Sequence, residues 1–294
     1  MKSFLILPLL LITSLIAGLS VSNAGPKAKD DFLKLFTTSK PLIAAVMVNA
    51  DEKSSAENEK AAQWALEQLK IAEDGGMQGI LIEFRGGEIL KPAITKEKYD
   101  AMLSILKQVT AKATKVVVGV EILWHYPEET LKIAKDGGAK FVRIDFFSDK
   151  VIADKAEVPI NPEALLKYRK KIKAESVFLL TDIQVKYSEM IDKNINIAQS
   201  AETAIKKGSD GLIVSAEKSG SAASKERMAL ARSGIKGKTP LLTGSGFSVA
   251  VAKDIVPLVD AIIVGTSISV KTGGPLLPEK VKELVETVNK LKTQ

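Results

Sequence analysis

The chain has 294 residues, of which 42 are lysine or arginine and 35 are aspartate or glutamate, giving a formal net charge of +7. This length suits one large domain, and the 46% apolar share supplies a core, which excludes global disorder. The chain has no cysteine and one histidine, His125, which excludes disulfides, thiolate nucleophiles and metal sites built from several histidines. Aromatic residues are sparse and not interleaved with basic clusters, so nucleic-acid binding is not expected.

The N-terminal segment has the pattern of a secretory signal peptide. Lys2 supplies a positive charge, residues 4–19 are almost wholly apolar, and Ser22 and Ala24 are small residues at the positions that a signal peptidase reads. We expect cleavage after Ala24, a mature domain of residues 25–294, and a secreted or periplasmic location. The alternative is an uncleaved segment that anchors the protein to a membrane. The mature chain would carry a charge of +6, so peripheral contact with an anionic membrane is a further expectation.

Short apolar runs alternate with helical patterns along the rest of the chain and predict parallel strands joined by helices. We expect strands at residues 42–48, 79–84, 115–123, 140–145, 177–182, 211–214, 241–242 and 261–264. We expect helices at 30–39, 57–74, 96–113, 128–136, 162–174, 197–207, 222–233 and 277–292, with a short one from Ser248 and a long loop at 146–160. Eight strand units predict a single-domain (β/α)8 TIM barrel, with a doubly wound open sheet as the alternative.

An internal repeat supports this interpretation. Residues 71–84, 133–146 and 204–215 each contain a helix end, a glycine stop and a buried apolar run in the same order. Repeated helix–glycine–strand units imply parallel strands with right-handed crossovers.

Two glycine-containing turns near the C-terminus predict an anion cradle. Gly244-Ser245-Gly246 and Gly265-Thr266-Ser267 each follow a buried apolar run, as do the phosphate-binding turns after strands 7 and 8 of many barrels. The alternative is that these glycines only make tight turns. On the cradle hypothesis, the helix from Ser248 points its N-terminus inward, and Gly246→Val reduces ligand binding more than stability.

Polar residues directly follow the predicted strands and therefore share one end of a barrel. They are Asn49, Glu83, Glu121, Arg143, Asp145, Asp182, Gln184, Lys186, Ser215, Ser245 and Thr266. Our catalytic candidates are Glu83, Glu121, Asp182 and Lys186, which can transfer protons, and Arg143 and Ser215 join the two turns as ligand-binding candidates. No spacing specifies a metal site, and the sequence identifies no cofactor. His125 is expected to be a surface or capping residue, and Trp124 and Tyr126 to pack over the barrel mouth.

The order and spacing of several segments resemble the BtpA family (BtpA/SgcQ family) from about Phe32 to Val285. The matching segments are Leu35-Phe36, Lys40-Pro41-Leu42-Ile43, Gly75-Gly76-x-x-Gly79-Ile80-Leu81-Ile82-Glu83, Gly138-Ala139-Lys140-Phe141-Val142-Arg143-Ile144-Asp145, Leu165-Leu166-Lys167-Tyr168-Arg169, Thr181-Asp182-Ile183-Gln184-Val185-Lys186, Gly244-Ser245-Gly246 and Val264-Gly265-Thr266-Ser267. The resemblance implies a TIM barrel, and the family's cyanobacterial namesake is implicated in photosystem I biogenesis.

The chain departs from the family pattern at three strand ends. Met47-Val48-Asn49-Ala50 replaces an H-L-x-P-L-P-G-type segment, residues 121–126 replace N-V-L-R-N-D, and Gln184 replaces the histidine of D-V-H-V-K. We expect an exported barrel that binds a phosphorylated or otherwise anionic small molecule, with or without acid–base catalysis. The alternative is a non-catalytic, membrane-associated assembly factor that keeps the barrel as a scaffold, and a homo-oligomer is compatible with either.

Overall fold

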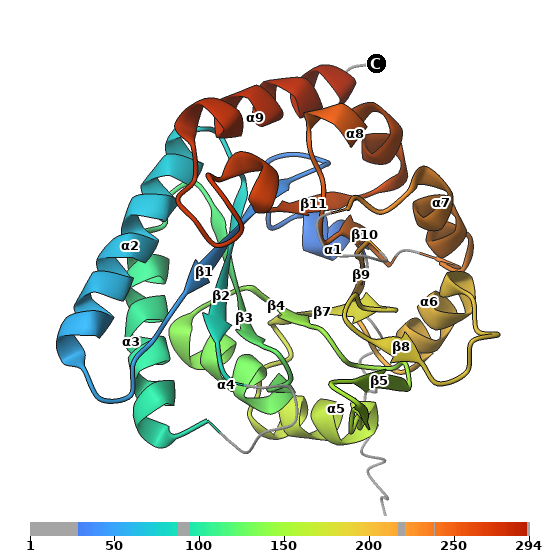
Figure 1. The fold of residues 1–294 in the computed structure, drawn as a ribbon, viewed down its shortest axis with the longest axis horizontal. Helices are drawn as coiled ribbons and strands as arrows, with labels where there is room; N and C mark the ends of the chain where they lie inside the picture. Colours follow the sequence, from blue (N-terminus) through green and yellow to red (C-terminus); the bar gives the residue numbers. More distant parts are fainter. Residues whose placement is uncertain (1–28, 88–93, 217–220, 238, 293–294) are drawn as a thin grey trace, which may run out of the picture.

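The computed structural model describes residues 29–87, 94–216, 221–237 and 239–292, which form a closed parallel β-barrel ringed by helices (Figure 1). The predicted signal peptide lies outside the described residues. The barrel strands are β1 (Leu42–Val48), β2 (Gly79–Arg85), β3 (Val117–Leu123), β4 (Phe141–Ile144), β7 (Phe178–Ile183), β9 (Gly211–Val214), β10 (Leu241–Thr243) and β11 (Ala261–Val264). Because β1 pairs in parallel with both β2 and β11, the sheet is closed, and the (β/α)8 barrel is confirmed over the open sheet.

Helices cover the outside of the barrel, and polar caps in the sequence start several of them. They are α1 (Lys29–Leu33), α2 (Ser55–Asp74), α3 (Lys96–Lys112), α4 (Pro127–Gly137), α5 (Pro162–Lys171), α6 (Ile197–Lys206), α7 (Lys225–Ser233), α8 (Val249–Ile255) and α9 (Pro278–Lys292). Asn196 caps α6 reciprocally with Gln199, and Gly138 ends α4 with a φ of 83°. Within the described part of the chain, no helix is both long and apolar enough to span a membrane.

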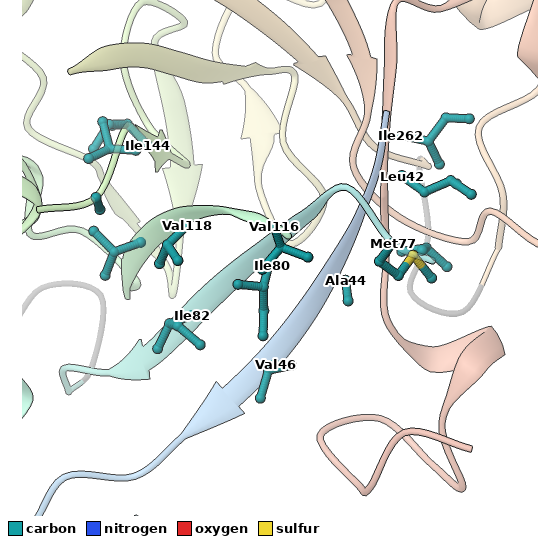
Figure 2. Close-up of a cluster of buried hydrophobic side chains, with 14 of the residues drawn as sticks. Leu42, Ala44, Val46, Met77, Ile80, Ile82, Val116, Val118, Ile144 and Ile262 are labelled. Atoms are coloured by element: carbon teal, nitrogen blue, oxygen red, sulfur yellow. The ribbon is translucent and has the colours of Figure 1, made fainter. Parts of the chain in front are cut away.

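The core has two parts, one outside the barrel and one inside it, because successive side chains of a strand point to opposite faces of the sheet. Ala44, Ile80 and Ile82 face outward and pack with the covering helices, as the close-up of this layer shows (Figure 2). Ile43 and Leu81 face inward and pack in the barrel interior with side chains from the opposite strands.

The first helix closes the amino-terminal end of the barrel and is shorter than the expected segment 30–39. Phe32 is fully buried. Its ring packs edge-on against Phe36, Phe141 and Phe178, with centroids 5.2–6.2 Å apart. This aromatic plug leaves the opposite, carboxyl end of the strands as the end where polar groups can gather.

The expectation of a plain loop at 146–160 is wrong. This segment contains β5 (Val151–Ala153) and β6 (Ala156–Glu157), which form a hairpin, and β8 (Glu189–Met190) pairs with β5 to give a three-stranded antiparallel sheet. The hairpin forms because Val151 and Ala153 are buried on a small separate apolar cluster. The sheet belongs to the β4–α5 and β7–α6 connections, which leave the carboxyl end of the barrel.

Candidate functional site

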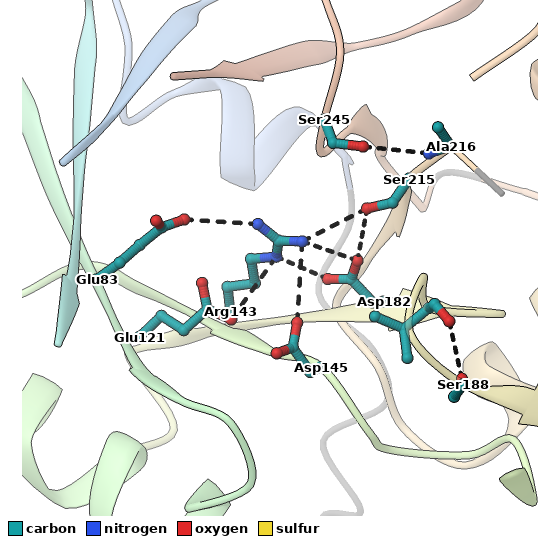
Figure 3. Close-up of polar contacts among 10 residues, drawn as sticks. Glu83, Glu121, Arg143, Asp145, Asp182, Ser188, Ser215, Ala216 and Ser245 are labelled. Atoms are coloured by element: carbon teal, nitrogen blue, oxygen red, sulfur yellow. Dashed lines mark hydrogen bonds and ion pairs between the residues drawn. The ribbon is translucent and has the colours of Figure 1, made fainter. Parts of the chain in front are cut away.

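A layer of charged side chains lies above the apolar interior, at the carboxyl ends of the barrel strands (Figure 3). Glu83 comes from β2, Glu121 from β3, Arg143 from β4 and Asp182 from β7. Each of these residues faces inward because it lies an even number of residues from an interior apolar residue of the same strand, as Glu83 does from Leu81. All four charged residues are more than nine-tenths buried. The structure therefore brings these predicted site residues together at one mouth.

Arg143 is the centre of this layer. Its Nε donates to Asp182 Oδ2 at 2.8 Å, and its Nη2 donates to Asp182 Oδ1 at 3.0 Å, which makes a bidentate pair. The Ser215 hydroxyl donates to the same Asp182 oxygen at 3.0 Å. Carboxylate oxygens of Glu83, Glu121 and Asp145 lie 3.6–3.8 Å from guanidinium nitrogens. Arg143 and Ser215, which we predicted to bind ligand, are thus engaged mainly with the protein's own carboxylates.

One guanidinium cannot balance four buried carboxylates, and the excess negative charge is relieved by binding protons. Burial raises the pKa of Glu121 well above its ordinary value, against the opposing charge of Arg143. Burial likewise raises the pKa of Glu83, and it raises the pKa of Asp145 to about 7. Among the described residues Glu121 Oε2 is buried and has no hydrogen-bond partner, so a negative charge on this oxygen would be poorly stabilised. The cluster therefore holds exchangeable protons near neutral pH.

Lys186 lies just beyond β7, at the rim of the mouth. Burial is the largest cause of the raised pKa of Glu83, and the charges of Arg143 and Lys186 oppose it. The Lys186 ammonium also lies 5.0 Å from the centroid of the Tyr187 ring. A second cation thus lies near the buried acids.

Gln184, two residues before Lys186, makes hydrogen bonds within the protein. Its backbone has a φ of 45°, and its amide N–H donates to Asp149 Oδ2 at 2.7 Å. Its side-chain Nε2 donates to the Ile195 carbonyl at 3.0 Å and to Ser200 Oγ at 3.2 Å. These contacts tie the end of β7 to the start of α6.

The two predicted glycine turns lie side by side, because Ser267 Oγ donates to the Phe247 carbonyl oxygen at 2.6 Å. The other hydroxyls also make contacts inside the protein. Ser245 Oγ accepts from the Ala216 amide at 3.1 Å, and Thr266 Oγ1 lies 3.1 Å from Thr272 Oγ1. The hydroxyls of the predicted cradle therefore connect the loops at the mouth, and anion binding by these turns stays a prediction.

The glycines of the first turn are required by close packing. A Cβ on Gly244 would lie 2.3 Å from Ile213 Cγ2 and 3.0 Å from Ser215 Oγ, so this glycine makes room for these two side chains. Gly246 has a φ of 67°, and a Cβ there would lie 2.0 Å from the Ser221 carbonyl oxygen. Gly246→Val would therefore strain the turn and collide with backbone, so this substitution lowers stability as well as any ligand binding. The helix after this turn, α8, does begin at Val249, directly after Ser248.

His125 and its aromatic neighbours pack against the protein. His125 Nε2 lies 2.6 Å from the Pro159 carbonyl oxygen, and burial lowers the pKa of the imidazole. The Trp124 ring packs edge-on against Tyr187 with centroids 5.5 Å apart, and Tyr126 is buried. Within the described ranges, no set of three or more carboxylates and histidines has an arrangement suited to a metal ion.

Two residues at the mouth were not among the catalytic or ligand-binding candidates, although Asp145 was expected at this end of the barrel. Asp145 shares the inward face of β4 with Arg143, and its spacing of two residues is the signal that identifies it. Arg85 is the last residue of β2 and shares the face of Glu83. We ended that strand at Phe84, and so Arg85 was missed.

Comparison with known proteins identifies the family. The model of the BtpA family matches residues 38–290. The chain belongs to the BtpA family. It is 27% identical over 199 residues to the photosystem I biogenesis protein BtpA of Synechocystis sp., covering 66% of this chain and 67% of that protein. It is also 27% identical over 273 residues to an uncharacterized mitochondrial protein of Caenorhabditis elegans, covering 88% and 97% of the two chains.

Solved structures agree with this BtpA-family barrel in fold. The N-(5'-phosphoribosyl)anthranilate isomerase of Pyrococcus furiosus superposes with a TM-score of 0.52, covering 85% of this chain and 99% of that chain, at 12% sequence identity. Thiamine phosphate pyrophosphorylase of the same organism gives a TM-score of 0.53 at 16% identity, covering 86% and 98%. At these identities the likeness establishes the (β/α)8 fold alone.

Proposed function

We propose that this BtpA-family barrel binds a phosphorylated or otherwise anionic small molecule at its mouth, and that its buried carboxylates transfer protons to or from that molecule. The observation that carries the proposal is the arrangement of Glu83, Glu121, Asp145 and Asp182 around the single guanidinium of Arg143. Burying this many acidic groups opposes folding, and carboxyl groups with raised pKa values gather preferentially at functional sites.

Each acidic group has a role that its surroundings favour. Glu121 is the general acid, because burial raises its pKa well above the ordinary value and so favours the protonated form. Asp145, with a pKa of about 7, both accepts and releases a proton near physiological pH. Asp182 is held in one orientation by Arg143 and Ser215, so it acts as a fixed electrostatic partner.

The rim of the mouth supplies what an anionic ligand needs. Lys186 brings a positive charge near Glu83, and the joined turns at 244–246 and 265–267 bring backbone amides to the same end of the barrel. Two structural neighbours have names that contain a phosphorylated compound. Because those proteins share only the fold, the proposal rests on the residues of this chain.

We further propose that the protein acts outside the cytoplasm, after cleavage following Ala24. The support is the N-terminal pattern of one positive charge, an apolar stretch and small residues at the cleavage site.

The second candidate function is a non-catalytic assembly factor. A relative at 27% identity carries the name of a photosystem I biogenesis protein. Gln184 stands where the family has a histidine, and it serves a structural contact with α6. On this hypothesis the barrel is a scaffold and its carboxylates do not take part in a reaction.

A thermal-shift screen of the mature protein against phosphorylated metabolites tests the proposal, with the unphosphorylated counterpart of each compound as its control. A ligand at about 100 times its Kd stabilises the folded state by about 2.7 kcal/mol, which raises the Tm measurably. Compounds that raise the Tm are then tested for turnover by the wild type and by Glu121→Gln. Turnover that Glu121→Gln loses supports the enzyme, and binding without turnover favours the scaffold. A screen in which no compound raises the Tm contradicts the proposed function.

A further inference from the structure

The chain has five arginines, and Arg85 differs from the other four. Arg143, Arg169 and Arg232 each pair with an aspartate, and Arg227 donates to the carbonyls of Ser215 and Gln184. The Arg85 side chain is exposed, and the contact that it makes with the described residues is from Nη2 to Met47 Sδ, at 4.0 Å. In the described part of the chain, no carboxylate pairs with this guanidinium.

Arg85 lines a cavity of about 430 Å³ next to the mouth of the barrel. One wall is the end of β1, with Met47 and Asn49, and another is α2, with Lys60 and Trp64. The Trp64 Nε1 donates to the Met47 carbonyl at 3.1 Å, which fixes the indole against this wall. The cavity is large enough for a small metabolite.

The segment between β11 and α9 forms the remaining wall. Gly273 has a φ of 71°, and a Cβ there would lie 2.9 Å from Met47 Sδ, so the absence of a side chain lets this segment approach β1. Thr272 also lines the cavity, and its hydroxyl contacts that of Thr266 at 3.1 Å. One of the predicted anion-binding turns is therefore continuous with this cavity.

Among the described residues that line the cavity, Arg85 is a cation without a carboxylate partner. Lys60 pairs with Glu57 at 2.7 Å. Asp51 Oδ1 accepts from the amides of Lys53 and Ser54 at 2.7 and 2.9 Å. A guanidinium that lines a polar cavity and has no carboxylate partner among the described residues favours an anionic group that accepts two parallel hydrogen bonds, as a phosphate does.

We propose that this cavity is the phosphate subsite of the barrel and that the ligand is a short phosphorylated polyol. Arg85 binds the phosphate, with the Thr272 hydroxyl and the Asn49 amide beside it. Arg85 and Glu83 lie two residues apart on the inward face of β2, which places their Cα atoms about 7 Å apart. On this proposal, the hydroxyl-bearing end of a ligand of three or four carbons extends from Arg85 toward Glu83. This inference rests on the proposed function and names its ligand class.

The test is isothermal titration calorimetry with glycerol 3-phosphate, erythrose 4-phosphate and ribose 5-phosphate as probes, and with glycerol, erythrose and ribose as unphosphorylated controls. Wild type is expected to bind at least one phosphorylated probe and to bind its control much more weakly. Arg85→Gln is expected to weaken binding of that probe roughly 10- to 100-fold, because it removes a charge-assisted hydrogen bond. Lys60→Gln, in the same cavity but at a paired lysine, is expected to change binding less than threefold.

Folding of the variants is checked by their Tm. Arg85→Gln should melt within about 2 °C of wild type, because an exposed side chain whose contact with the described residues is a weak one to Met47 contributes little to stability. If a probe binds and Arg85→Gln binds it equally well, the subsite is wrong, while ligand binding at the mouth stands. If none of the phosphorylated probes binds to wild type, the phosphorylated-polyol assignment is wrong. If the wider screen of phosphorylated metabolites is also negative, the proposed function fails with it.

Discussion

Replacing Asp145 by asparagine tests whether the buried carboxylates destabilise the fold as their surroundings imply. Burial raises the pKa of Asp145 to about 7, against the opposing charge of Arg143. A free aspartate has a pKa of about 3.9. The folded protein holds this proton up to about pH 7, whereas the unfolded chain releases it near pH 4. Raising the pH through this window therefore shifts the equilibrium toward the unfolded state.

Above pH 7 the full difference in pKa lowers the free energy of unfolding by roughly 4 kcal/mol. Roughly 3 kcal/mol of this loss arises between pH 5 and pH 8. Asparagine keeps the shape of the side chain and carries no charge to bury. We therefore expect the free energy of unfolding of Asp145→Asn, relative to wild type, to rise by roughly 2–3 kcal/mol from pH 5 to pH 8. A gain in stability at a functional position would fit the usual conflict between stability and activity.

The assay is urea-induced unfolding followed by circular dichroism at pH 5, 6, 7 and 8. Asp254→Asn is the matched control, because this aspartate lies on α8 with 62% of its side chain exposed. The control should stay within about 0.5 kcal/mol of wild type at each pH. The reasoning is refuted if the effect of Asp145→Asn is the same at pH 5 and pH 8, or if the variant is less stable than wild type at pH 8.

Three further predictions test other parts of the structure. Arg143→Met should lower the free energy of unfolding by about 3–5 kcal/mol at pH 8, because it removes the guanidinium around which the four buried carboxylates lie. The loss in urea unfolding should shrink at pH 5, because the carboxyl groups with raised pKa values bind more protons there, and equal losses would count against the charge argument. Phe32→Ala should cost about 3–5 kcal/mol, because it removes the fully buried ring that plugs the barrel. A variant that melts like wild type would show that this plug is dispensable. N-terminal sequencing of the exported protein should begin at Gly25, and a retained Met1 would indicate the anchored form.

Much of the barrel could be predicted from the sequence, because each strand is a short buried apolar run bounded by glycines or polar residues. The run at 42–48 is predicted with the bounds that the structure gives it, Leu42–Val48, as is the run at 211–214. The hairpin of β5 and β6 could not be predicted in this way. Its turn places Asp154 and Lys155 at φ values of 49° and 65°, without the glycine that usually marks such a turn.

The candidate site could be predicted in its location and only partly in its chemistry. Side chains alternate along a strand and parallel strands share one carboxyl end, so the sequence alone places Glu83, Glu121 and Asp182 at one mouth. The sequence does not show that Arg143 pairs with them, because this depends on how far one long side chain reaches across the barrel. Arg85 was missed because a strand end was placed one residue early, and one residue decides whether a side chain counts as part of the sheet.

The most direct test of the account is a crystal structure of the mature protein with the phosphorylated compound that binds most tightly in the screen. The account predicts that the compound lies at the carboxyl end of the barrel, with its phosphate on the Arg85 side and its hydroxyl groups against Glu83 and Glu121. A compound bound on the outer helices, with the mouth of the barrel unchanged, would contradict it.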